Sequence, residues 1–232
     1  MFLLVHGAAN SSGVWQLWQM ALADSGYASV AMDLRGHGDA KNDDLAQTGM
    51  ADYAADVVAA AAHVDGPVVL AGWSMGGLVA LMAAPLVRPV ACVLLAPSAP
   101  SRIVDTNLPL RSGVFGPEVY GITSADPDDQ SAMPDLTRSE RMVALVSLGS
   151  ESQRARDERT RGVVVATPAC PVLLATGTDD RLWPADRYRD MPFAADRVEV
   201  LGASHWGLVL NGRVVPSLVA DVVTWLQGCL RQ

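Results

Sequence analysis

Short apolar runs alternate along the chain with longer segments whose apolar positions recur every three or four residues. A short apolar run is typical of a buried strand, and the longer spacing is typical of a helix packed on one side. The runs predict strands near residues 1–5, 28–33, 67–73, 90–96, 171–176 and 197–201. The spaced segments predict helices at 15–24, 51–64, 78–84 and 217–230. This alternation predicts an α/β fold, with a mostly parallel sheet and helices on both of its faces.

Residues 98–168 interrupt the alternation. Within them, 138–148 has an amphipathic pattern, and 150–162 is rich in both basic and acidic residues. Half of the 232 residues are hydrophobic, which is enough for one substantial core. We therefore expect a single α/β domain over residues 1–232, with 98–168 inserted into it.

The strongest chemical signal is the stretch 72–77, which reads Gly-Trp-Ser-Met-Gly-Gly. It follows a predicted strand and precedes a predicted helix, as a Gly-x-Ser-x-Gly nucleophile elbow requires. The glycines leave room for a sharp turn that exposes the hydroxyl of Ser74. Ser74 is the candidate nucleophile.

A serine nucleophile needs a base and an acid, which follow it in the order Ser, acid, His. His205 is the only histidine after Ser74, and it lies in a loop just after a predicted strand. Two carboxylates, Asp179 and Asp180, follow the strand near 171–176. The carboxyl ends of parallel strands are where α/β active sites form, so both carboxylates are candidate acids.

At this point the chain resembles the α/β-hydrolase superfamily, in its single-domain serine esterase branch. The resemblance rests on His-Gly at residue 6, on residues 72–77, on Gly-Thr-Asp-Asp-Arg-Leu-Trp-Pro at 177–184, on Gly-Ala-Ser-His at 202–205, and on Asp-Leu-Arg-Gly-His-Gly at 33–38. It implies the α/β-hydrolase fold with a trimmed N-terminus. It also implies that residues 98–168 form a small helical cap over the active site.

The family pattern Gly-x-x-Asp-x-x-x-Pro favours Asp180 over Asp179 as the acid. The resemblance thus implies a catalytic triad of Ser74, Asp180 and His205. It places the oxyanion hole at the backbone N–H groups of Met75 and Ala8, with Ala9 as the alternative to Ala8. His6 is expected to brace its loop, and His37 and His63 are expected to be a turn residue and a helix-end residue.

The resemblance further implies cleavage of a carboxylic ester, a small ester or lactone, through an acyl-enzyme intermediate. An acyl-carrier-protein methyl ester esterase or a thioesterase is the alternative within this class. A ligand receptor on the same fold is the alternative from another class. Trp206 stands where related lyases carry lysine, which argues against lyase chemistry.

The amino-acid composition limits which kinds of binding partner the protein can have. The net charge of −8 and the lack of a basic run argue against nucleic-acid binding, and no apolar run is long enough to span a membrane. The first five residues are too short for a signal sequence, and three cysteines do not suggest a disulfide framework, so we expect a cytoplasmic protein. A small ester is the expected partner. No cofactor or metal is expected, and the sequence says nothing of oligomeric state.

The insertion is expected to select the substrate without taking part in chemistry, since its ionisable groups lack a partnered motif. Apolar residues of 138–148, such as Met142 and Leu145, are expected to line the acyl pocket. The charged stretch that follows could meet an acidic substrate or carrier protein. The preferred interpretation is a solvated helix face with internal ion pairs, formed by Arg154, Arg156, Arg159 and Arg161 with Glu151, Asp157 and Glu158.

Overall fold

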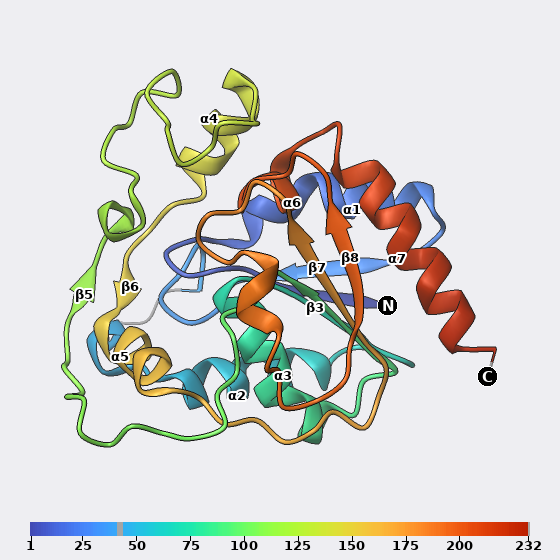
Figure 1. The fold of residues 1–232 in the computed structure, drawn as a ribbon, viewed down its shortest axis with the longest axis horizontal. Coiled ribbons are helices and arrows are strands. Elements are labelled where there is room, and N and C mark those ends of the chain that lie inside the picture. The colour runs from blue at the N-terminus through green and yellow to red at the C-terminus, as the bar shows by residue number, and fades with distance from the viewer. Residues whose placement is uncertain (41–43, 232) are drawn as a thin grey trace.

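The computed structural model describes residues 1–40 and 44–231, and a parallel β-sheet forms its centre (Figure 1). In the described residues the sheet has six strands in the order β2-β1-β3-β4-β7-β8, all parallel to their neighbours. The strands are β1 (Phe2–Val5), β2 (Ser29–Met32), β3 (Val69–Trp73), β4 (Ala91–Leu95), β7 (Val172–Gly177) and β8 (Asp196–Val200). Each predicted strand is present to within two residues, and the predicted α/β fold is confirmed.

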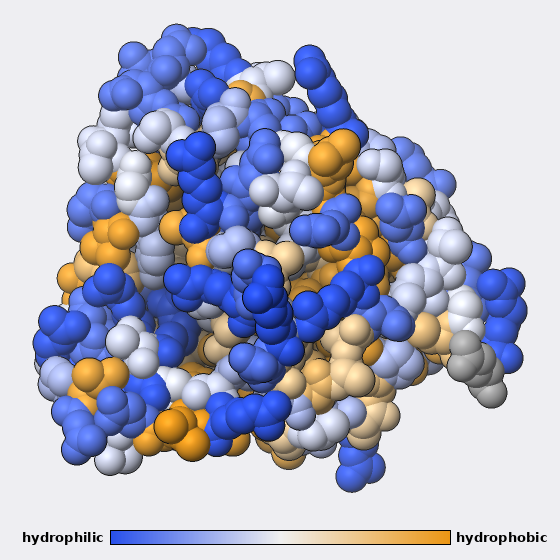
Figure 2. All heavy atoms as spheres, in the orientation of Figure 1, coloured by the Kyte–Doolittle hydropathy of each residue, from blue (hydrophilic) through white to orange (hydrophobic). Residues whose placement is uncertain are grey.

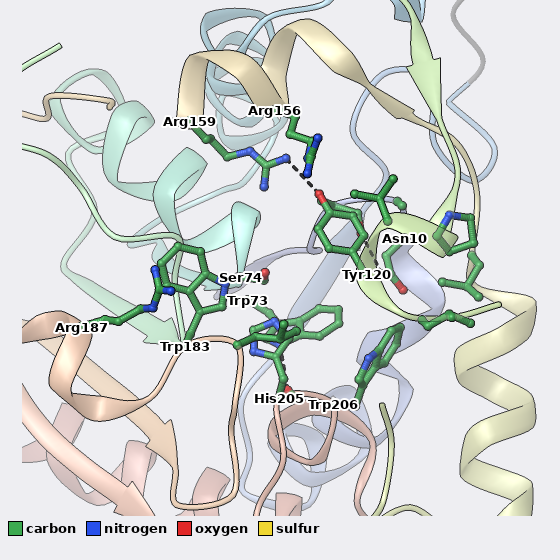
Figure 3. Close-up of a pocket in the computed structure, with 17 residues that line it drawn as sticks. Asn10, Trp73, Ser74, Tyr120, Arg156, Arg159, Trp183, Arg187, His205 and Trp206 are labelled. Carbon is green, nitrogen blue, oxygen red and sulfur yellow. Dashed lines mark hydrogen bonds between the residues drawn. The ribbon is translucent and has the colours of Figure 1, made fainter. Parts of the chain in front are cut away.

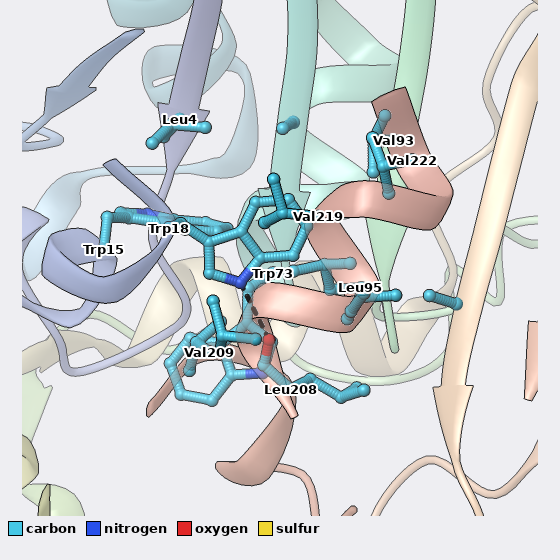
Figure 4. Close-up of a cluster of buried hydrophobic side chains, with 14 of the residues drawn as sticks. Leu4, Trp15, Trp18, Trp73, Val93, Leu95, Leu208, Val209, Val219 and Val222 are labelled. Carbon is cyan, nitrogen blue, oxygen red and sulfur yellow. Dashed lines mark hydrogen bonds between the residues drawn. The ribbon is translucent and has the colours of Figure 1, made fainter. Parts of the chain in front are cut away.

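Both faces of the sheet are covered because its central strands are apolar on both sides. Phe2 and Leu4 of β1 pack with α1 (Gln16–Asp24), α6 (Gly207–Leu210) and α7 (Val215–Cys229). Leu3 and Val5 point the other way and pack with α2 (Met50–Ala61) and α3 (Met75–Val87). Figure 4 shows the first cluster, in which Trp73 lies among side chains from these strands and helices.

Helix α3 begins earlier than its sequence pattern predicts. We expected residues 78–84, but the helix runs from Met75 to Val87 and takes Gly76 and Gly77 into its first turn. The apolar pattern misses this turn because glycine carries no hydrophobic signal and is a poor helix former. The consequence is that the helix starts directly after Ser74.

The insertion lies to one side of the sheet in Figure 1. It contains β5 (Val114–Phe115), η3 (Pro117–Tyr120), α4 (Arg138–Val146), β6 (Glu151–Ser152) and α5 (Gln153–Arg161), with β5 and β6 paired antiparallel. Helix α4 begins at a capping box, in which the Thr137 hydroxyl accepts from the N–H of Glu140 and the Glu140 carboxylate accepts from the N–H of Thr137. The remaining short 3-10 helices are η1 (Ser12–Trp15), η2 (Leu45–Gln47) and η4 (Ala185–Tyr188).

Hydrophilic side chains cover most of the face in Figure 2, with smaller apolar areas between them. Within residues 1–40 and 44–231, no helix is both long enough and apolar enough to cross a membrane.

Candidate active site

Ser74 occupies a strained turn between β3 and α3. Its φ of 55° and ψ of −122° are unusual for a residue other than glycine. The turn is tight enough that a Cβ on Gly72 would overlap the carbonyl oxygen of Gly76, and a Cβ on Gly76 would overlap that of Val5. The Gly-x-Ser-x-Gly pattern is therefore required sterically, and it presents the Ser74 side chain at the start of α3.

His205 and Asp180 are joined by a short hydrogen bond. Asp180 Oδ2 lies 2.7 Å from His205 Nδ1, and the two side chains are almost wholly buried. The other carboxylate oxygen of Asp180 accepts from the N–H groups of Leu182 and Trp183, each at 2.8 Å. Burial alone would raise the pKa of Asp180, but the hydrogen bonds from His205 and these amides lower it below the ordinary 3.8. Asp180 is thus held as a carboxylate.

Asp179, the other candidate acid, lies outside this arrangement. It is exposed to solvent, and its carboxylate contacts the neighbouring Thr178 hydroxyl at 3.4 Å. The structure therefore brings Asp180, and not Asp179, to His205.

Ser74 and His205 line the same cavity, which Figure 3 shows with Trp73 beside them. The Trp73 ring lies 5.1 Å from that of His205, and its Nε1–H donates to the His205 carbonyl at 3.0 Å. Among the hydrogen bonds of the described residues, none joins the Ser74 hydroxyl to the His205 ring. Such contacts are often long in ligand-free enzymes and shorten when substrate binds.

The loop after β1 forms the facing wall. Ala8, Ala9 and Asn10 line the cavity, and Ala9 adopts a φ of 54°. The N–H of Ala9 donates to Glu151 Oε2 at 3.1 Å, so this amide already has a carboxylate acceptor. Ala8 is then the stronger candidate for an oxyanion donor from this loop, together with Met75 at the first position of α3.

His6 braces this loop. Its Nε2 accepts from the N–H of Leu34 at 3.1 Å, and its Nδ1 lies 2.8 Å from the carbonyl of Gly7. Burial, with a smaller effect of the nearby His37, lowers the pKa of His6 to about 4. The ring is neutral at pH 7, which suits one nitrogen that accepts and one that donates.

Glu151 is fully buried, whereas the charge pattern of the sequence predicted it on a solvated helix face among arginines. Besides the Ala9 amide, it accepts from the Tyr53 hydroxyl at 2.6 Å, and its Oε2 lies 3.4 Å from His37 Nε2. Burial opposes the ionised forms, but the two groups stabilise each other, so the pKa of Glu151 is lowered and that of His37 is raised. The ionisable groups of the insertion were expected to lack a partnered motif, but Glu151 belongs to a buried cluster with Tyr53 and His37. His37 lies in its turn as expected, but its ring belongs to this buried cluster.

The cavity has a volume of about 280 Å³. The insertion supplies much of its apolar wall, through Pro117, Val119, Tyr120, Ile122 and Leu148. Met142 and Leu145 of α4 are not among the lining residues, and Met142 is 49% exposed in a separate outer groove. The expectation that they form the acyl pocket is wrong, because α4 turns its apolar face toward η1 and α6 instead.

The charged helix α5 also differs from its preferred interpretation. Arg154 pairs with Glu158 at 3.1 Å, as expected for a solvated face with internal ion pairs. Arg156 and Arg159, however, line the cavity, as does Arg187 from η4. Charged residues recur along the whole of α5, so the sequence pattern cannot show which of them face the cavity. It therefore did not predict Arg156 and Arg159 as cavity residues.

The fold and the Ser74, His205 and Asp180 arrangement define the class: an α/β-hydrolase fold with a site of the serine-hydrolase type. A model of the alpha/beta hydrolase family matches residues 2–216, and the chain belongs to this family.

Two relatives are similar in sequence. The chain is 30% identical over 190 residues to pimeloyl-[acyl-carrier protein] methyl ester esterase of Pectobacterium carotovorum subsp. carotovorum (strain PC1), which covers 79% of this chain and 67% of the relative. It is 37% identical over 86 residues to protein phosphatase methylesterase 1 of Mus musculus, which covers 35% of this chain and only 22% of that relative.

Solved structures agree on the fold. Polyneuridine aldehyde esterase superposes with a TM-score of 0.72 at 17% identity and covers 96% of this chain and 98% of its own. A methylesterase from Arabidopsis gives 0.71 at 19% identity, with 97% and 98% covered.

Proposed function

We propose that this chain is a serine hydrolase that cleaves a small carboxylic ester or lactone through an acyl-enzyme intermediate. The observation that carries the proposal is the 2.7 Å hydrogen bond from His205 to Asp180 beside a cavity that also receives Ser74. The family and the named esterases among its relatives support it.

In the first half-reaction Ser74 Oγ attacks the carbonyl carbon of the ester, and its proton passes to His205 Nε2. Asp180 fixes the orientation of the ring and stabilises the imidazolium that forms. The tetrahedral intermediate then expels the alcohol, which takes the proton from His205. The acyl group is left on Ser74.

In the second half-reaction water attacks the acyl-enzyme and gives its proton to His205. The second tetrahedral intermediate then releases the carboxylic acid, and His205 returns the proton to Ser74. In both intermediates the negative oxygen accepts hydrogen bonds from the N–H groups of Met75 and Ala8. The N-terminus of α3 adds its positive dipole end at the same place.

The cavity of about 280 Å³ is close to the small end of typical ligand pockets and favours a small ester.

We further propose a cytoplasmic location, because Cys92, Cys170 and Cys229 are all free thiols.

A panel of aryl esters, lactones and acyl thioesters, measured with the wild type and with Ser74→Ala, tests the proposal. Sustained turnover of esters or lactones that is lost in Ser74→Ala is the expected result. Tight binding without multiple turnover would instead indicate a ligand receptor on this fold.

A second candidate follows from the relative that acts on a pimeloyl-[acyl-carrier protein] methyl ester. In that case the methyl ester of an acyl chain attached to an acyl carrier protein would be cleaved with a much higher kcat/KM than the methyl ester of the same acyl chain without the carrier protein.

A further inference from the structure

The wall of the cavity carries positively charged side chains, although the chain as a whole is acidic. The sequence has 25 acidic and 17 basic residues, yet the described residues that line the cavity include three arginines and no aspartate or glutamate. The arginines are Arg156 and Arg159 of α5 and Arg187 of η4. Figure 3 shows Arg156 and Arg159 together on one side of Ser74 and Arg187 beside Trp183 on another.

None of the three arginines has an acidic partner in the part of the chain that the structure describes. Arg156 lies over the Phe115 ring at 5.5 Å, and Arg187 lies over the Trp183 ring at 5.0 Å. Arg159 donates to the Tyr120 hydroxyl at 3.2 Å and to the Ala155 carbonyl at 3.3 Å. No carboxylate oxygen within the described ranges lies within 4.0 Å of any of these guanidinium groups. By contrast, at least one carboxylate lies that close to each of Arg35, Arg111, Arg138, Arg154 and Arg189.

The carboxylates near Arg156 and Arg159 in sequence are already engaged elsewhere. Asp157 pairs with Arg111 at 2.6 Å, and Glu158 pairs with Arg154 at 3.1 Å. Glu151 accepts from Tyr53 and from the Ala9 amide. The three cavity arginines therefore form no hydrogen bond or close ion pair with a carboxylate of the described residues, and Glu151 acts on the Arg159 charge only from a longer distance.

A guanidinium at the wall of a small, partly apolar cavity is costly to desolvate without a counter-charge. The same group binds a carboxylate or phosphate with short, charge-assisted and often bidentate hydrogen bonds. We propose that the substrate carries an ionised acidic group beside its ester, and that Arg156, Arg159 and Arg187 bind this group. The inference deepens the proposed ester hydrolysis and rests on it, with a half-ester of a dicarboxylic acid as the simplest substrate of this kind.

The first test needs only the wild type. The kcat/KM for monomethyl adipate, which keeps a free carboxylate, is compared with that for dimethyl adipate. The kcat/KM values for 3-acetoxybenzoate and phenyl acetate are compared in the same way. In this second pair the anion lies on the alcohol side of the ester, whereas in the first pair it lies on the acyl side. We expect a preference for the anionic member of about tenfold to a hundredfold in one series, the scale of hydrogen bonds to a charged group. A preference for the neutral member in both series would overturn the proposal.

The second test removes the charges one at a time, as Arg156→Gln, Arg159→Gln and Arg187→Gln. The matched control is Arg154→Gln, on the same helix, whose guanidinium pairs with Glu158 and does not line the cavity. We expect the anionic-to-neutral ratio of kcat/KM to fall about tenfold in the cavity variants and to stay at the wild-type value in Arg154→Gln. An unchanged ratio in all three cavity variants would overturn the proposal. Labelling of Ser74 by a phosphonate verifies that each variant is folded.

Calorimetry with Ser74→Ala separates this inference from the proposed hydrolysis. If Ser74 is not the nucleophile, the proposed hydrolytic mechanism fails for both esters. The anion site is independent of that role, so Ser74→Ala should still bind monomethyl adipate more tightly than dimethyl adipate. Equal affinity for the two esters in Ser74→Ala, with hydrolysis intact in the wild type, would overturn the anion site alone.

Discussion

The carboxylate of Glu151 accepts a hydrogen bond from the main-chain N–H of Ala9 at 3.1 Å, across 142 positions of the chain. Ala9 lies in the loop that faces Ser74, and its φ of 54° is unfavourable for an L-residue. The carbonyl oxygen of Ala9 is held as well, because it accepts a hydrogen bond from the N–H of Gly149 at 3.0 Å. The insertion therefore holds the loop that carries the proposed oxyanion donor Ala8.

Glu151→Gln should lower kcat by about tenfold or more and change KM less. The amide keeps the size of the side chain but removes the charge that pairs with His37. The N–H of Ala9 therefore loses its charged acceptor, while apolar binding contacts stay in place. Glu199→Gln, on an exposed position of β8, is the matched control and should leave both constants unchanged. A fall confined to KM would mean that Glu151 does not position the oxyanion loop.

The stability effect of the same substitution should depend on pH. The pKa of Glu151 is lowered in the fold, so its contribution is present above the ordinary 4.5 and is lost as the pH falls below it. The pKa of His37 is raised, so its contribution is present below the ordinary 6.5 and is lost as the pH rises through the raised value.

The free energy of unfolding, measured in urea, should therefore differ most between wild type and Glu151→Gln at pH 5 to 6.5. The expected difference there is about 3 kcal/mol, as for the loss of one partner of a buried pair. It should shrink toward pH 3. A difference that is constant from pH 3 to pH 7 would contradict the assigned ion pair.

Asp180→Asn should lower kcat by roughly 10³- to 10⁴-fold, while Asp179→Asn leaves it near the wild-type value. An asparagine cannot stabilise the imidazolium, and it allows the wrong tautomer of His205. Steady-state rates on one aryl ester decide between the two residues. The reverse order of the effects would assign the acid to Asp179.

Most of the fold could be predicted because its signals are local. The strands are short apolar runs, and the elbow is a fixed spacing of glycines around Ser74. The succession of strands along the chain and the position of the candidate nucleophile therefore follow from the sequence. The candidate base His205 follows by elimination, since no other histidine comes after Ser74.

The rest of the site depends on contacts between distant segments. Asp179 and Asp180 differ by one position, and only the turn after β7 decides that Asp180 points toward His205. Glu151 looks like one charge among several until the fold buries it beside His37. Charge pattern alone likewise does not tell Arg154, which faces Glu158, from Arg156, which faces the cavity.

The insertion should set chain-length preference through Ile122 rather than through Met142. Ile122 is buried and lines the cavity, so Ile122→Ala enlarges it. The ratio of kcat/KM for hexanoyl over acetyl aryl esters should rise by about tenfold, within the 1–3 kcal/mol that apolar pockets discriminate. Met142→Ala, in the outer groove, is the control and should keep the wild-type ratio. A shift in Met142→Ala alone would place the acyl chain against α4.

The proposed role of Ser74 as the nucleophile can be tested by covalent labelling. The wild type is treated with an aryl phosphonate, and the modified peptide is identified by mass spectrometry, with Ser74→Ala treated in parallel. We expect one phosphonate on Ser74, none on the Ser74→Ala variant, and a loss of esterase activity of several orders of magnitude in that variant. Labelling of a different residue, or full activity in Ser74→Ala, would contradict the proposed role.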